Sequence, residues 1–110
     1  VLDEIEAGRR IAVLGDMLEL GSWSADAHRE TGAYVAGSRT DLLIAVGKAA
    51  AHIAEGAAGA GFPGSRTAVL ANNGEAIRYL QGIVRRGDAI LVKGSRGMMM
   101  EEIVNALVSG

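Results

Sequence analysis

Cysteine is absent from the 110 residues, proline occurs once, and aromatic residues make up only 4%. Without cysteine the chain has neither disulfides nor a catalytic thiol, which fits a reducing compartment, and we expect a cytoplasmic protein. No apolar run approaches the ~20 residues that a membrane-spanning helix needs. The chain also has no large excess of one charge, because it contains 11 basic and 13 acidic residues. The basic residues form no block. This balance argues against general nucleic-acid binding.

Metal-ligand spacing is also missing, because the two histidines, His28 and His52, lie far apart in the sequence. The chain opens on Val1-Leu2-Asp3-Glu4, which is acidic, and no apolar segment typical of a signal peptide follows. Residues 1–8 show a helical apolar pattern without an N-cap, so we expect them to be the tail of a preceding helix in a longer protein. The 110 residues are 49% hydrophobic and sufficient for a single domain with a real core.

Short apolar stretches alternate four times with helical patterns. The expected strands are 11–14, 42–46, 67–70 and 89–92, and a helix follows each of them; 17–23 and 59–65 are expected to be loops. The first helix, which Ser22 or Ser24 is expected to cap, should run to about Gly37 with Ala27, Thr31, Tyr34 and Val35 inward. Such alternation with short connections predicts an α/β Rossmann-like fold, with a mainly parallel sheet and helices on both faces.

A glycine or a polar residue ends each expected strand. Because parallel strands point the same way, these ends should share one edge of the sheet, where open α/β sheets bind ligands. Cations and anions meet there, which favours an anionic or zwitterionic small molecule. Every one of these residues also has a structural reading, such as capping a turn or a helix. The strand ends are Gly15-Asp16 with Glu19 beyond, Gly47-Lys48, Asn72-Asn73 with Glu75 as a capping partner, and Lys93-Gly94-Ser95-Arg96.

The last of these strand ends, residues 93–96, contains the most groups suited to binding a ligand. A buried apolar strand passes into a glycine-rich turn with two cations and a hydroxyl, and a helix pattern follows. Backbone N–H groups at a helix N-terminus attract anions, while Gly94 and Gly97 allow a ligand close to the backbone. Arg96 adds a flat fork of donors that suits a carboxylate or a phosphate. The structural alternative, in which Ser95 caps the helix and the cations are solvated, stays open.

Familiar nucleotide-binding signatures are absent. The segment from Gly15 to Gly21 is too widely spaced for a dinucleotide fingerprint, and Gly47-Lys48 is followed by Ala49 rather than by the hydroxyl of a Walker A loop. A Gly-x-Ser-x-Gly elbow is missing as well. The chain should therefore neither bind ATP by such a loop nor carry out a complete reaction alone.

Two stretches together resemble the C-terminal domain of the Mur ligase family. Residues 10–21 read RIAVLGDMLELG and are followed by His28 and Gly32, and residues 88–96 read DAILVKGSR and are followed by Met100-Glu101. The combination, with about 70 residues between the two stretches, is far more specific than either motif alone. The resemblance covers roughly residues 9–108.

The resemblance implies that residues 1–110 are the third domain of a three-domain, ATP-dependent amide ligase. The reaction closest to this pattern adds D-alanyl-D-alanine to a UDP-N-acetylmuramoyl-tripeptide in bacterial peptidoglycan precursor synthesis, while ATP and Mg²⁺ are bound mainly by the absent central domain. The isolated domain should then be inactive. The implied substrate-binding residues are Asp16, at the dipeptide amine or the ATP side of the cleft, and Lys93, Gly94, Ser95 and Arg96, with Arg96 at the dipeptide carboxylate. Further candidates are Glu19, His28, Lys48, Asn72 and Asn73.

Two other classes of function remain. One is a free-standing α/β module that binds a small molecule for regulation, and the other is a flavodoxin-like or receiver-like interaction domain. Against a receiver, Asn72-Asn73 stands where the third strand ends and no phosphoacceptor aspartate is present there. The sequence upstream of Val1 in the source gene discriminates between a ligase and a free-standing module.

Overall fold

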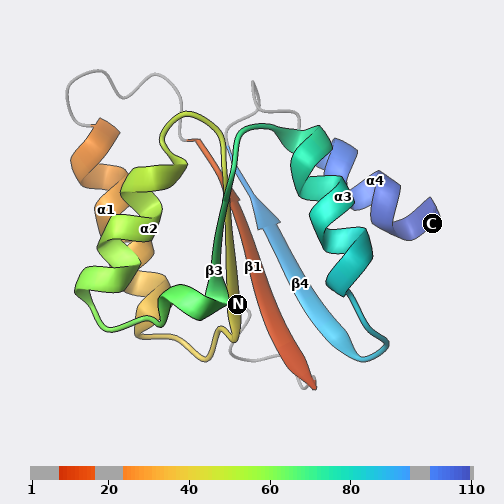
Figure 1. Ribbon diagram of the computed structural model, residues 1–110, viewed down its shortest axis with the longest axis horizontal. Coiled ribbons are helices and arrows are strands. Elements are labelled where there is room, and N and C mark those ends of the chain that lie inside the picture. Colours follow the sequence, from red (N-terminus) through yellow and green to blue (C-terminus); the bar gives the residue numbers. More distant parts are fainter. Residues whose placement is uncertain (1–7, 17–23, 95–99, 110) are drawn as a thin grey trace.

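The computed structural model describes residues 8–16, 24–94 and 100–109 (Figure 1). None of the helices in these ranges is long and apolar enough to cross a membrane. Strands and helices alternate along the chain, with one 3-10 turn before the third strand. In chain order the elements are β1 (Arg9–Gly15), α1 (Ser24–Ala36), β2 (Leu42–Val46), α2 (Ala50–Gly59), η3 (Gly64–Arg66), β3 (Thr67–Leu70), α3 (Asn73–Ile83), β4 (Asp88–Lys93) and α4 (Glu101–Ser109).

The four strands form one parallel sheet in the order β3-β2-β1-β4. In this register Ile11 of β1 lies between Leu42 of β2 and Ile90 of β4. Helices α1 and α2 cover one face, and α3 and α4 cover the other (Figure 1). The α/β Rossmann-like fold expected from the sequence is thereby confirmed.

Each face of the sheet has its own core, because side chains alternate along a strand. On β1, Ala12 and Leu14 face α1 and α2, whereas Ile11 and Val13 face α3 and α4. All four are at most 5% exposed, as expected for an inner strand of a parallel sheet that is covered on both faces.

Helices α1 and α2 approach each other through glycines. A Cβ atom on Gly32 would lie 1.9 Å from the carbonyl oxygen of Ile53, and a Cβ on Gly56 would lie 1.9 Å from that of Arg29. The inward stripe of α1 is therefore built around Gly32. The sequence pattern placed Tyr34 on this stripe, and that prediction is wrong, because the side chain is 72% exposed.

Three smaller expectations also need correction. The 59–65 region is not entirely an exposed loop, since Phe62 is buried against the α1–α2 core and η3 begins at Gly64. The spacing of Ile77, Leu80 and Val84 predicts that Val84 belongs to the third helix, but α3 ends at Ile83 and Val84 is its C-cap. In the last helix, the spacing of Met100, Ile103, Val104 and Leu107 predicts an inward apolar face, but Val104 is 42% exposed.

An ion pair between Arg9 and Asp88 joins the first residues of β1 and β4. Nη2 of Arg9 lies 2.7 Å from Oδ2 of Asp88, and Nε lies 3.2 Å from Oδ1, so the contact is bidentate. The same Nη2 donates to the carbonyl of Ile83, the last residue of α3. These hydrogen bonds from Arg9 hold the pKa of the Asp88 carboxyl below its ordinary value.

Asp88→Asn is expected to lower the free energy of unfolding by about 2 kcal/mol at neutral pH, because hydrogen bonds to a charged group are lost. Since the folded-state pKa of Asp88 is depressed, its stabilisation is present above the unfolded-state pKa of about 4 and is lost as the pH falls through the folded-state value. Urea denaturation of both proteins in a pH series should show a constant difference near neutrality that closes in acid. A difference independent of pH would contradict this account.

Candidate functional site

The carboxyl ends of the four strands meet at the upper edge of the sheet in Figure 1. Asp16, directly after β1, is the most buried polar residue of this edge at 7% exposure. Its Oδ2 accepts a hydrogen bond of 3.0 Å from the backbone N–H of Lys48, and its Oδ1 accepts one of 2.9 Å from that of Ala49. The carboxylate therefore holds the turn that leads from β2 into α2.

Two glycines make the close packing at this edge feasible. Gly47 has a φ of +114°, and an added Cβ would lie 2.6 Å from Oδ1 of Asp16. A Cβ on Gly94 would lie 2.8 Å from Cγ of Met100 and 3.3 Å from Cα of Gly15. Sequence reasoning treated Gly47 only as the end of a strand and Gly94 as an approach for a ligand. The structure adds a packing reason for each.

Lys48 and Lys93 are both exposed. Among the described residues, neither ammonium group forms an ion pair with a carboxylate. Asp16 thus contacts Lys48 through its backbone N–H, while the two lysine charges remain available to an anion in solution.

Asn72 is the N-cap of α3, and its Oδ1 accepts a hydrogen bond of 2.9 Å from the backbone N–H of Glu75. Oε1 of Glu75 in turn accepts from the N–H of Ala71, at 3.3 Å. The cap by Asn72 that the sequence indicated is thus present, whereas the carboxylate of Glu75 accepts from the residue before the N-cap rather than from the N-cap itself. The neighbouring Asn73 donates from Nδ2 to Oε1 of Glu102, which connects the start of α3 to α4.

The remaining predicted residues are Glu19, His28, Ser95 and Arg96. Glu19, Ser95 and Arg96 lie outside the described residues. His28 is fully buried in α1, which favours its structural reading over contact with a ligand.

The centre of the edge lies between β1 and β4. These strands pair directly, with Leu14 opposite Lys93, although about 70 residues separate them in sequence. The chain leaves β1 toward one face of the sheet and leaves β4 toward the other, which makes this a topological switch point, the usual position of a ligand in such sheets. Within residues 8–16, 24–94 and 100–109 there is no group of three or more His, Cys, Asp or Glu side chains that could hold a metal ion.

Sequence comparison places residues 1–96 in the family described as "Mur ligase, glutamate ligase domain". The chain is 39% identical over 101 residues to the UDP-N-acetylmuramoyl-tripeptide–D-alanyl-D-alanine ligase of Bacillus subtilis, covering 92% of this chain and 22% of that protein. It is 38% identical to the ligase of the same name from Escherichia coli, covering 91% and 21%. The chain thus spans about a fifth of the length of these relatives.

Structural comparison agrees with the sequence match. A crystal structure of MurF from Acinetobacter baumannii superimposes with a TM-score of 0.81 at 27% identity, covering 93% of this chain and 22% of that one. MurF ligase from Thermotoga maritima, solved in complex with ADP, shares the fold with a TM-score of 0.67 at 24% identity, covering 90% and 21%.

Proposed function

Because this chain belongs to the Mur ligase family, we propose that it forms the C-terminal domain of an ATP-dependent ligase that joins D-alanyl-D-alanine to a UDP-N-acetylmuramoyl-tripeptide. The observation that carries the proposal is the 39% identity over 92% of the chain to a relative of that name. A regulatory module without catalysis is not favoured, since these relatives contain the matching region within a much longer ligase. The proposed setting is the bacterial cytoplasm, during the synthesis of peptidoglycan precursors.

In this proposal the chain holds the dipeptide, and the preceding domains hold the UDP-sugar and ATP with Mg²⁺. The tripeptide carboxylate first takes the terminal phosphoryl group of ATP to give an acyl phosphate and ADP. The dipeptide amine then attacks the acyl carbon, so that a C–N bond forms, the C–O bond to phosphate breaks, and the nitrogen loses a proton. This domain contributes orientation of the amine, which lowers the barrier by proximity.

The carboxyl edge offers matching groups for the dipeptide. Exposed Lys48 and Lys93 supply positive charge beside the β1–β4 junction. Arg96, which follows in the chain, is proposed to bind the dipeptide carboxylate with its bidentate fork. Asp16, with both oxygens bonded to backbone N–H groups, is proposed to position the edge rather than to contact substrate.

The proposal is tested with the full-length gene product. Sustained conversion of ATP to ADP and phosphate should require both UDP-N-acetylmuramoyl-tripeptide and D-alanyl-D-alanine, because without the dipeptide the acyl phosphate is not consumed. Mass spectrometry should find the tripeptide extended by the dipeptide. The isolated 110-residue chain, assayed as a control, should release no phosphate. Extension by a single amino acid such as glutamate, with no reaction of the dipeptide, would overturn the proposed substrate.

A variant of the same enzyme tests the role of Arg96. Arg96→Ala should raise the KM for D-alanyl-D-alanine roughly 30-fold, or about 2 kcal/mol, because a charge-assisted pair is lost. The KM values for ATP and the UDP-tripeptide should not change, and Arg96→Lys should recover only part of the loss. Arg78→Ala, at an exposed arginine of α3, is the matched control. An unchanged dipeptide KM would remove Arg96 from the carboxylate site.

A further inference from the structure

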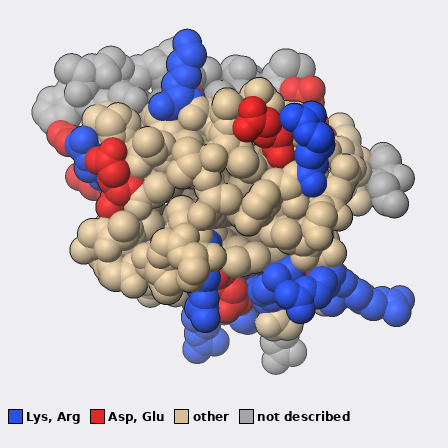
Figure 2. All heavy atoms as spheres, viewed as in Figure 1, with Lys and Arg blue, Asp and Glu red and all other residues tan. Residues whose placement is uncertain are grey.

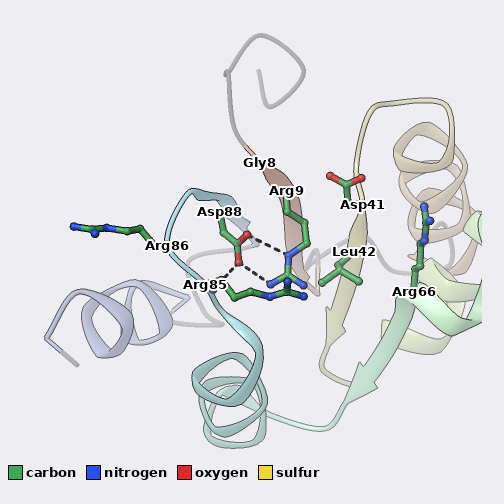
Figure 3. A pocket seen from close by; sticks show the side chains of 8 residues that line it. All are labelled: Gly8, Arg9, Asp41, Leu42, Arg66, Arg85, Arg86 and Asp88. Carbon is green, nitrogen blue, oxygen red and sulfur yellow. Dashed lines mark hydrogen bonds and ion pairs between the residues drawn. The ribbon is translucent and has the colours of Figure 1, made fainter.

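The amino ends of the strands form a second polar edge, opposite the proposed substrate edge. Figure 2 shows basic side chains gathered along this lower side of the molecule. A groove of about 460 Å³ opens there, within the size range of small-molecule sites. We call it the arginine groove, and its charged lining residues are Arg9, Arg66, Arg85, Arg86, Asp41 and Asp88 (Figure 3).

Charge in the groove is unbalanced. Four arginines face two aspartates, a local charge of +2 in a chain whose net charge is −2. Asp88 is already neutralised by Arg9 and accepts a further hydrogen bond of 2.8 Å from the backbone N–H of Arg85. Oδ2 of Asp41 accepts a bond of 2.7 Å from the backbone N–H of Arg10. Both carboxylates are thus occupied by groups that belong to the fold.

The side chains of the other three arginines are not paired as that of Arg9 is in the described structure. Within the described ranges, no carboxylate forms an ion pair with the guanidinium group of Arg66, Arg85 or Arg86. In Figure 3, Arg85 lies beside Arg9 and Arg66 stands on the opposite side, with Leu42 between them, whereas Arg86 points away. Two exposed guanidinium groups therefore flank the groove from the β4 and β3 sides.

We propose that the arginine groove binds a small molecule with two or more phosphoryl groups, one held by Arg85 and another by Arg66. Planar guanidinium groups bind phosphate oxygens in pairs, and two of them on opposite walls match an anion with two charged ends better than a single phosphate. The site is separate from the carboxyl edge and does not depend on the proposed function.

Calorimetric titration of the 110-residue chain with inorganic pyrophosphate, at constant ionic strength, tests the proposal. Saturable 1:1 binding is expected, and orthophosphate should bind at least about tenfold more weakly. Arg66→Ala and Arg85→Ala should each weaken pyrophosphate binding by at least about tenfold, whereas Arg78→Ala should leave it within about twofold. Both replaced side chains are exposed, so the variants should fold, and circular dichroism checks this.

A competing explanation is that the arginines only offset the negative C-terminal ends of the helices that lie at this edge, as Arg9 does for α3. In that case the Arg66→Ala and Arg85→Ala variants would melt at a lower temperature, and titration with pyrophosphate would show no saturable binding. That result, an equal loss in Arg78→Ala, or equal affinity for orthophosphate would each overturn the proposal.

Discussion

Gly32→Ala is expected to lower the free energy of unfolding by about 3 kcal/mol, among the largest effects of any single methyl group in this chain. The new Cβ would lie 1.9 Å from the carbonyl oxygen of Ile53 and 2.8 Å from the backbone nitrogen of Ala57. Both neighbours are backbone atoms of α2 and cannot rotate away. Helices α1 and α2 must therefore move apart, which opens the core around Val35 and Ile53.

Gly82→Ala is the matched control, because it makes the same change in α3, where no atom lies within 4 Å of the added Cβ. It should raise stability by about 0.5 kcal/mol through helix propensity. Gly56→Ala should resemble Gly32→Ala, and the double variant should cost less than the sum of the two, since separating the helices once relieves both clashes. Urea denaturation followed by circular dichroism measures all four. A loss below about 1 kcal/mol for Gly32→Ala would show that the helices move apart at little cost.

The same glycine explains where sequence reasoning failed in α1. The residues that face inward are His28, Gly32 and Val35, spaced by four and three. A search for apolar periodicity passes over a histidine and a glycine. It therefore predicted Val35 correctly but also chose Ala27, Thr31 and Tyr34, each one position before an inward residue. Close helix contact through glycine leaves no hydrophobic signal. The buried parts of the inner strands β1 and β2 were predicted well because they are apolar, although β1 also includes Arg9 and Arg10, which the apolar pattern left out.

The two polar edges show a similar contrast. Strand ends such as Asp16 and Lys93 were predicted to share an edge because parallel strands must align, and the described residues do so. The same reasoning applies to the amino ends, where Arg9 begins β1 and Arg66 precedes β3. These arginines are scattered in sequence and formed no basic block, so their proximity was missed. By contrast, the backbone bonds of Asp16 depend on the conformation of the β2–α2 turn, which composition does not reveal.

Asp16→Asn is expected to lower the free energy of unfolding by about 3 kcal/mol, because the amide can accept only one of the two backbone N–H bonds and its NH₂ group faces the other donor. Gly47→Ala should destabilise by a similar amount. Its Cβ would lie 2.6 Å from Oδ1 of Asp16, and its φ of +114° is unfavourable for alanine. Both changes disrupt one contact, between Asp16 and the β2–α2 turn, from its two sides.

Comparing Asp16→Asn with Gly47→Ala in the full-length enzyme shows whether Asp16 only positions the β2–α2 turn or contacts the substrate directly. If Asp16 only holds the turn that carries Lys48, the two variants should show the same rise in the KM for D-alanyl-D-alanine, to within about threefold. Their double variant should then be no worse than either alone, because the contact can be lost only once. Steady-state kinetics below the melting temperature of the weaker variant provides the comparison. A tenfold or greater additional loss of kcat/KM in Asp16→Asn would instead show that the carboxylate acts on the substrate itself, since Gly47→Ala disturbs the contact but retains the carboxylate.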